Sequence, residues 1–186
     1  SYDLPNLISV ANITRTGGWV LRVNASSGSF QGGLADSRIR DIDIEGQMNG
    51  IWLAQFASVR IDRVQIASFA TNGGIGFKAG QTGAPVLQGA NLDIQGMEIY
   101  GNNLTPTFGV LGSMPDVAYV IEDVNSVFMA NSGGGGARTS ILRVVSNGGL
   151  TQNLQFVQSV FDATVSGPSV HVTGPGSVAD IGFTGC

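Results

Sequence analysis

Charged residues, cysteine and histidine are all scarce in this chain of 186 residues. Only 12% of the residues are charged, and 9 Lys and Arg against 13 Asp and Glu give a net charge of −4. No basic cluster is present, so the composition argues against nucleic acid as a partner. A single cysteine, Cys186, excludes an intramolecular disulfide, and together with the single histidine, His171, it cannot build a zinc site. We therefore expect no metal and no cofactor.

Long apolar runs and helical periodicity are also missing. No run approaches the roughly 18 residues of a membrane-spanning helix, so we expect no membrane insertion. No secretory signal is visible in "SYDLPNLISV", and the abrupt ends of the chain lead us to expect a piece of a longer protein. What the chain does contain is 28 glycines, about twice the usual share, and enough apolar residues for one domain with a sizeable core.

A kinked apolar motif recurs along the chain. Its pattern is apolar–x–x–apolar–x–apolar, and its copies begin at Ile39, Ile61, Ile94, Val124, Val157 and Val178. In the fifth copy Asp162 takes the last apolar position. A short apolar segment precedes each copy, beginning at Trp19, Gly50, Gly74, Phe108, Ile141 and Ser169. Repeats of short strands with glycine-rich turns are typical of a β-solenoid.

The repeat predicts an all-β fold, a right-handed single-stranded parallel β-helix of about six coils. It would occupy residues 19–186, with residues 1–18 as an N-terminal edge segment. Insertions such as 24–37 and 80–91 would bulge at one corner and leave the core intact. An antiparallel β-sandwich is the alternative; it explains short strands but not six copies of one kinked motif. In the solenoid, equivalent residues of successive coils stack about 4.8 Å apart.

This repeat pattern resembles the right-handed parallel β-helix of the pectate-lyase-like superfamily. Within it, the low charge and the surface rich in Asn, Gln and Ser are most similar to phage tailspikes and capsule depolymerases. The resemblance implies a homotrimeric or multidomain protein, on a virion tail or extracellular, that recognises a bacterial surface polysaccharide. It leaves open whether the chain also degrades that glycan as a hydrolase or lyase. A non-catalytic structural or adhesive fibre segment is the alternative, and no catalytic signature of the family is found.

Stacking gives most of the charges a structural explanation. In register, Arg40 would lie on Asp62 and Asp41 on Arg63, two reciprocal pairs that also disfavour a slipped register. The same columns would continue as a ladder of amides, namely Gln95, Asn125 and Gln158.

The column just before each copy predicts a catalytic pair. Asp93 would stack on Asp123 about 5 Å apart, a separation suited to retaining glycoside hydrolysis. Arg60 would keep Asp93 ionised, and Asp123, with Glu122 beside it, would donate a proton. The alternative is that Arg60 simply pairs with Asp93 and Asp123 points into solvent.

A second carboxylate pair and several aromatic residues are further candidates. Asp43 and Glu98 would lie two coils apart, about 9.6 Å, near the separation of inverting enzymes, with Gln65 between them. Trp52 alternates with buried positions and would face outward as a glycan contact. The predicted substrate-binding residues are thus Trp52, Arg60 and Glu98.

Other aromatic side chains receive a structural interpretation. Trp19 and Tyr100 are candidate sugar platforms, but packing at a coil end or under a loop is the preferred interpretation. Phe128 and Phe161 would share an outward column and form a lateral contact between subunits.

Overall fold

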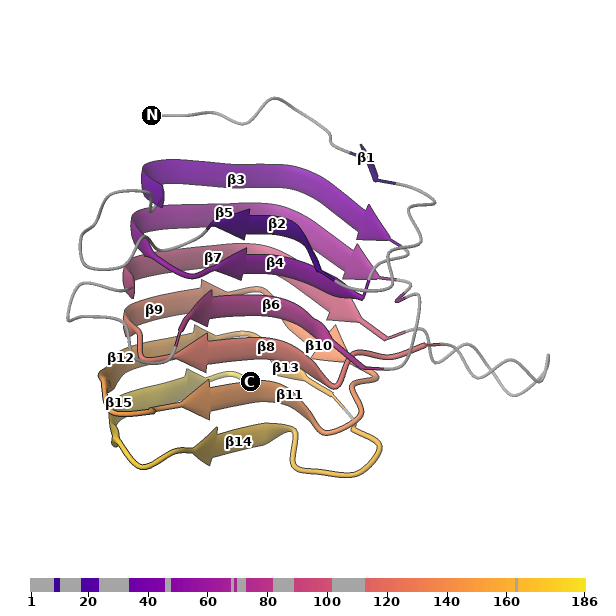
Figure 1. Ribbon diagram of the computed structural model, residues 1–186. Helices are drawn as coiled ribbons and strands as arrows, with labels where there is room; N and C mark the ends of the chain where they lie inside the picture. The colour runs from indigo at the N-terminus through magenta and orange to yellow at the C-terminus, as the bar shows by residue number, and fades with distance from the viewer. Residues whose placement is uncertain are drawn as a thin grey trace.

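The computed structural model describes residues 9–10, 18–23, 34–45, 48–67, 69, 73–81, 89–101, 113–162 and 164–186. Every regular element in these ranges is a β-strand, which confirms the all-β prediction. All ladders between these strands are parallel, so the antiparallel sandwich is wrong. The arrangement is compatible with a β-solenoid (Figure 1).

The strands form two sheets. Sheet 1 contains β1 (Ser9–Val10), β3 (Leu34–Glu45), β5 (Phe56–Ala67), β7 (Gly89–Tyr100), β9 (Asn125–Ala130), β10 (Gly133–Gly135), β12 (Leu150–Val157), β13 (Val160–Phe161) and β15 (Ser177–Thr184). Sheet 2 contains β2 (Trp19–Val23), β4 (Asn49–Leu53), β6 (Ile75–Gly80), β8 (Val117–Glu122), β11 (Ser140–Val145) and β14 (Val170–Thr173). Neighbours run β1-β3-β5-β7-β9-β12-β15 in sheet 1, with β10 and β13 beside this path, and β14-β11-β8-β6-β4-β2 in sheet 2.

The chain alternates between the two sheets, so that neighbouring strands come from successive passes (Figure 1). We call a strand of sheet 2, with the sheet 1 strands that follow it, a layer. Of the short segments predicted to precede each motif, those near residues 19, 50, 74, 141 and 169 contain strands of sheet 2. The segment from Phe108 lies outside the described residues, and the strand at Val117–Glu122 was not predicted.

Two kinks divide the strands of sheet 1. The first lies at Asp36, Ser58, Asn91, Ser126, Asn153 and Asp180, and the second at Asp41, Arg63, Gly96, Asn131, Gln158 and Gly185. All of these residues have φ between 47° and 70°, the left-handed region that Gly, Asn and Asp tolerate best. The ladders pair the residues that flank equivalent kinks, so each kink forms a column through the layers.

Because both kinks share one local pattern, the predicted register is wrong beyond the third motif. The first three copies surround the second kink and pair as predicted, Ile39 with Ile61 and Ile61 with Ile94. The copy from Val124 surrounds the first kink, so Met129 is the partner of Ile94. The predicted amide ladder is therefore also wrong.

In place of that ladder, Gln95 and Asn125 have other neighbours. Gln95 lies beside Ala130, and Asn125 lies beside Gln152. The Nε2 of Gln152 donates to Oδ1 of Asn125 at 3.2 Å. Polar amides thus do stack between layers, but at the first kink rather than at the second.

The core lies between the sheets and is built from apolar columns. One column contains Ile39, Ile61, Ile94, Met129, Phe156 and Phe183. Its first five members are buried, whereas Phe183 is 46% exposed because β15 has a neighbouring strand on one side only. A second column contains Val59, Leu92, Val127, Leu154 and Ile181.

The predicted lateral column of Phe128 and Phe161 does not exist. Phe128 is exposed and pairs with Asp93 and Gln155. Phe161 instead packs against the core, with its ring centroid 5.7 Å from that of Phe156 and 6.0 Å from that of Phe183. The reason is the register shift, which turns the position of Phe161 toward the core.

Tyr119 of β8 connects the two sheets through hydrogen bonds of its hydroxyl group. Its side chain is fully buried, and its hydroxyl lies 2.8 Å from the carbonyl oxygen of Met97 and 2.6 Å from that of Gly133. Both acceptors belong to sheet 1, so one proton donor reaches across the core to two strand segments. Burial, with smaller effects from Tyr100 and Glu98, raises the pKa of Tyr119 well above its ordinary range.

We expect Gln158→Asn to stabilise the protein. Gln158 holds φ of 47° at a kink where neighbouring layers have Asn131 and Gly185. A left-handed conformation costs most L-residues about 1–2 kcal/mol, less for Asn, so a gain of about 0.5–1 kcal/mol is expected in urea unfolding. Gln155→Asn, three residues earlier in β12 and without positive φ, should give no gain. A lower stability of the Gln158 variant would contradict the strain argument.

We expect Tyr119→Phe to cost about 1–2 kcal/mol, since two buried carbonyls lose a donor. The native protein should also lose stability above about pH 10. There the unfolded tyrosine ionises while the buried one keeps its proton, so the folded state binds more protons. Unfolding free energies measured from pH 8 to 11 should show a shallower decline in the variant. Tyr100→Phe, at an exposed tyrosine, should change the stability little. An unchanged pH slope in Tyr119→Phe would refute this explanation.

Candidate functional site

Asp62 of β5 forms ion pairs with two arginines just before the second kink. It is 3% exposed and accepts hydrogen bonds from Arg38 and, at 2.9 Å, from Arg60. The two arginines are direct ladder partners, so their charges would repel each other without this carboxylate. Burial acts to raise the pKa of Asp62, but the hydrogen bonds from Arg60 and Arg38 outweigh it, and the pKa is lowered.

Of the two reciprocal charge pairs predicted from stacking, one is confirmed. Arg63 donates to Oδ1 of Asp41 through Nε at 2.7 Å, and its terminal nitrogen lies 2.6 Å from the same oxygen. Arg40 does lie beside Asp62 in the ladder, but Asp62 pairs with Arg38 and Arg60 instead. The predicted ladder neighbour of Asp62, Arg40, is correct, but Arg40 is not its ionic partner. Side chains on one strand face also reach their diagonal neighbours, and Arg38 reaches Asp62 in this way.

Asp93 and Asp123 do not form the predicted pair. Asp93 lies opposite Phe128, and its Oδ2 is 3.7 Å from Nε of Arg60. That contact agrees with the structural alternative for Arg60 and Asp93. The geometric basis for a retaining pair is absent, because the Val124 motif belongs to the first kink and Asp123 precedes it.

Asp123 closes a turn between layers rather than pointing into solvent. It is 7% exposed, and its Oδ1 accepts hydrogen bonds from the backbone N–H groups of Asn147 at 2.9 Å and Gly149 at 3.2 Å. Its φ of 48° is a further left-handed position outside the two kink columns. These contacts give Asp123 a structural role.

Glu122 and Trp52 belong to the outer side of sheet 2. Glu122 is buried, 2.5 Å from Nζ of Lys78, and accepts a hydrogen bond from Nδ2 of Asn147 at 2.7 Å. Trp52 donates from Nε1 to the carbonyl of Gly80 at 2.9 Å. Arg22 lies 4.2 Å from the Trp52 ring centroid. Because its ring already contacts other side chains, Trp52 is not an open platform, and its glycan role stays a prediction.

The packing interpretation of Trp19 agrees with the structure. The ring centroid of Trp19 lies 5.4 Å from that of Trp52, and Lys78 approaches the same Trp52 ring at 5.2 Å. Trp19, Trp52, Arg22 and Lys78 therefore form an aromatic and cationic cluster on sheet 2. Asp43, Arg60 and Glu98 lie on sheet 1.

A groove opens along the second kink on the outside of sheet 1. It encloses about 350 Å³ and is lined by Asp41, Ile42, Asp43, Arg63, Val64, Gln65, Gly96 and Glu98. The lining residues come from β3, β5 and β7, three successive strands. Gly96 contributes no side chain at its kink, and the buried Ile42 and Val64 contribute apolar surface.

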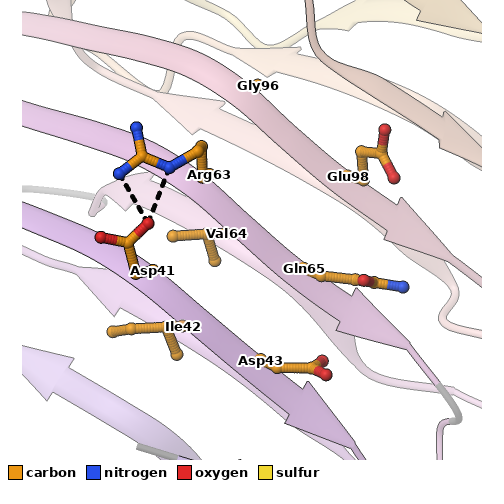
Figure 2. Close-up of a pocket in the computed structure, with 8 residues that line it drawn as sticks. All are labelled: Asp41, Ile42, Asp43, Arg63, Val64, Gln65, Gly96 and Glu98. Atoms are coloured by element: carbon orange, nitrogen blue, oxygen red, sulfur yellow. Dashed lines mark hydrogen bonds and ion pairs between the residues drawn. The ribbon is translucent and has the colours of Figure 1, made fainter. Parts of the chain in front are cut away.

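The second predicted carboxylate pair lies in this groove. Asp43 pairs with Gln65 in the ladder, and Gln65 pairs with Glu98, as the stacking predicted. Figure 2 shows the three side chains in a row on successive strands, with the Asp41–Arg63 ion pair at the other side of the groove. Two ladder steps separate Asp43 from Glu98, about 9.6 Å.

Two carboxylates and an amide, those of Asp43, Glu98 and Gln65, provide acceptor groups along the groove. Oδ1 of Asp43 is buried and receives no hydrogen bond within the described part of the chain. Among the described residues, the cation of the groove, Arg63, is engaged by Asp41. Carboxylates and an amide on a partly apolar wall suit a ligand with many hydroxyl groups. Stacking predicted the row of Asp43, Gln65 and Glu98, but only the bend at the kink brings this row together with Asp41, Arg63 and Gly96 to line one hollow.

Neither a candidate metal site nor a membrane-spanning helix occurs among the described residues. No group of three or more His, Cys, Asp or Glu side chains gathers there in a way that could hold a metal ion. A helix long and apolar enough to cross a membrane is likewise not found in that part of the chain. Comparisons of the chain with family models, with curated proteins and with solved structures found no match.

We expect Asp62→Asn to cost about 1–3 kcal/mol, the range for a hydrogen bond to a charged partner. The pKa of Asp62 is lowered by folding, so its contribution is present above its unfolded pKa and lost as the pH falls through the folded value. Urea unfolding at pH 7 and at pH 3 should therefore show a smaller difference between the variant and the native protein at pH 3. Asp93→Asn, at a more exposed ion pair, should cost under 1 kcal/mol. Equal costs for both would contradict the central role of Asp62.

Proposed function

We propose that this chain is a right-handed parallel β-helix module that binds a polysaccharide on its outer face. Support for the helix comes from the alternation of the chain between two parallel sheets and from the six positions of each kink. The right hand follows from the strong preference of parallel crossovers. In this description the layers are coils, and the ends of the two predicted insertions, residues 34–37 and 89–91, belong to β3 and β7.

The observation that carries the binding proposal is the groove. It is concave, spans three coils and presents Asp43, Gln65 and Glu98 in one row. Hydrogen-bonding groups therefore recur about every 4.8 Å along the stack, a spacing similar to the length of one pyranose unit. A linear glycan lying across the strands would meet an equivalent acceptor at each step.

We extend the proposal to hydrolysis in the same groove. The strand spacing of about 9.6 Å between Asp43 and Glu98 lies just above the carboxyl separations of inverting enzymes, about 6.5–9.5 Å. Gln65 between them would contact the sugar or the attacking water. Asp93, Asp123 and Glu122 have no place in this version, because Asp93 and Asp123 are apart and Asp123 and Glu122 are engaged in contacts between layers.

The biological setting is carried by the resemblance alone. On that basis we propose a bacterial surface polysaccharide as ligand, a place on a virion tail or outside a cell, and assembly into a homotrimer. The rival is a structural fibre segment without a ligand. It is favoured by the many ion pairs of sheet 1 that need no ligand, and it predicts no specific glycan binding.

We expect the double variant Asp43→Asn/Glu98→Gln to weaken polysaccharide binding at least 10-fold, because it removes two charged acceptors from the groove. Binding is measured on a panel of bacterial surface polysaccharides by calorimetry, and release of reducing ends is measured in parallel. The matched control is Asp36→Asn/Asp180→Asn, which removes two exposed charges at the first kink.

Each outcome bears on the proposal. Weaker polysaccharide binding by Asp43→Asn/Glu98→Gln, with native binding by Asp36→Asn/Asp180→Asn, supports the proposed groove. Equal loss in both variants would place the glycan elsewhere, and no binding by the native protein would favour the structural fibre. Reducing-end release that survives the groove substitutions would exclude Asp43 and Glu98 as the catalytic pair.

A further inference from the structure

Beside the groove, β10 leaves a strip of bare backbone on sheet 1. It consists of Gly133, Gly134 and Gly135, and it pairs with β7 on one side and β13 on the other. Gly134 faces the core, where an added Cβ would lie 2.7 Å from Ile141. Gly133 and Gly135 face the opposite way and present no side chain on the outer face of the sheet.

Tyr100 of β7 lies over this glycine strip. A Cβ at Gly133 would be 3.3 Å from the Tyr100 hydroxyl, and one at Gly135 would be 3.5 Å from a Tyr100 ring carbon. The side chain of Tyr100 is nevertheless substantially exposed, at 41% for the residue. One side of the ring therefore rests on glycine backbone while the rest remains open to a ligand.

The glycine strip continues the groove. Glu98 lines the groove and pairs with Gly133, and Tyr100, two residues later on the same strand face, pairs with Gly135. Along a strand two residues span about 6.6 Å. Burial, together with the charges of Glu98 and Asp162, raises the pKa of Tyr100, so the phenol stays neutral at pH 7.

The charges of this continuous surface are mainly negative. Its cation, Arg63, is paired with Asp41. Within the described residues no salt bridge joins Asp43 or Glu98 to a cation. An anionic sugar would be repelled here, whereas an ammonium group would be attracted by the carboxylates and by the tyrosine ring.

We propose that Tyr100 is a sugar-stacking platform at the end of the groove, and that the ligand is a glycan that carries free amino groups. This inference rests on the proposed function and names its substrate class. A sugar ring would stack on the open side of Tyr100, and its neighbours in the chain would reach Glu98, Gln65 and Asp43. Free amino groups would pair with the carboxylates along the path.

The test uses three soluble probes of equal length: oligomers of glucosamine, of N-acetylglucosamine and of galacturonic acid. We expect the native protein to bind them in that order of decreasing affinity, with the preference for glucosamine shrinking between 50 mM and 500 mM salt. Tyr100→Ala should weaken glucosamine binding about 5- to 10-fold. Tyr100→Phe keeps the ring and should stay within about twofold of the native protein.

The matched control is Phe128→Ala, which removes another exposed aromatic residue of sheet 1, 43% exposed, away from the groove. If Asp43→Asn/Glu98→Gln weakens binding but Tyr100→Ala behaves like Phe128→Ala, the platform is refuted while the groove stands. Tighter binding of the galacturonate probe would overturn the amino-sugar assignment. If the native protein binds neither these probes nor any polysaccharide of the wider panel, the proposed function itself fails.

Discussion

In-register parallel pairing between successive passes of the chain is the constraint on which the rest of this structure depends. Once two layers pair, every residue of a strand has an equivalent neighbour about 4.8 Å above and below. Side chains at equivalent positions of neighbouring layers must then pack against one another in a column. The apolar column from Ile39 to Phe156 satisfies this requirement in the core. Tyr119 adds a directional contact between the two sheets.

The kinks are the second requirement of the stack. Left-handed residues bend the chain in sheet 1 at two places five residues apart, and the bends coincide from layer to layer. A bend that matched no neighbour would break the ladder, so a kink in one layer favours a kink in the next. The groove on β3, β5 and β7 is a consequence of this rule, since it follows the second kink through three layers.

Charge is distributed according to the same rule. In the outer columns, like charges would face each other unless a carboxylate lies between them, as Asp62 does for Arg38 and Arg60. Asp41 and Arg63 satisfy each other at the kink itself. Asp43 and Glu98 have no such partner among the described residues, and this contrast separates the groove from the structural ion pairs around it. The glycine strip under Tyr100 is the other departure from the regular pattern of the outer face.

The sequence by itself determined the all-β parallel architecture, most of the strands, and the stacking of Ile39, Ile61 and Ile94 with the charges beside them. Short-range alternation and turn residues carry this information, because it depends only on neighbours in the chain. Tertiary structure alone decided the register after Ile94. The motifs at the two kinks are locally identical, so the Val124 motif fits either kink, and only packing against the preceding strand selects the first. That choice separated Asp93 from Asp123, turned Phe161 toward the core and laid Tyr100 over glycine. Because a shift of five residues moves each side chain to a new neighbour without changing the local pattern, no reading of the sequence alone could place them.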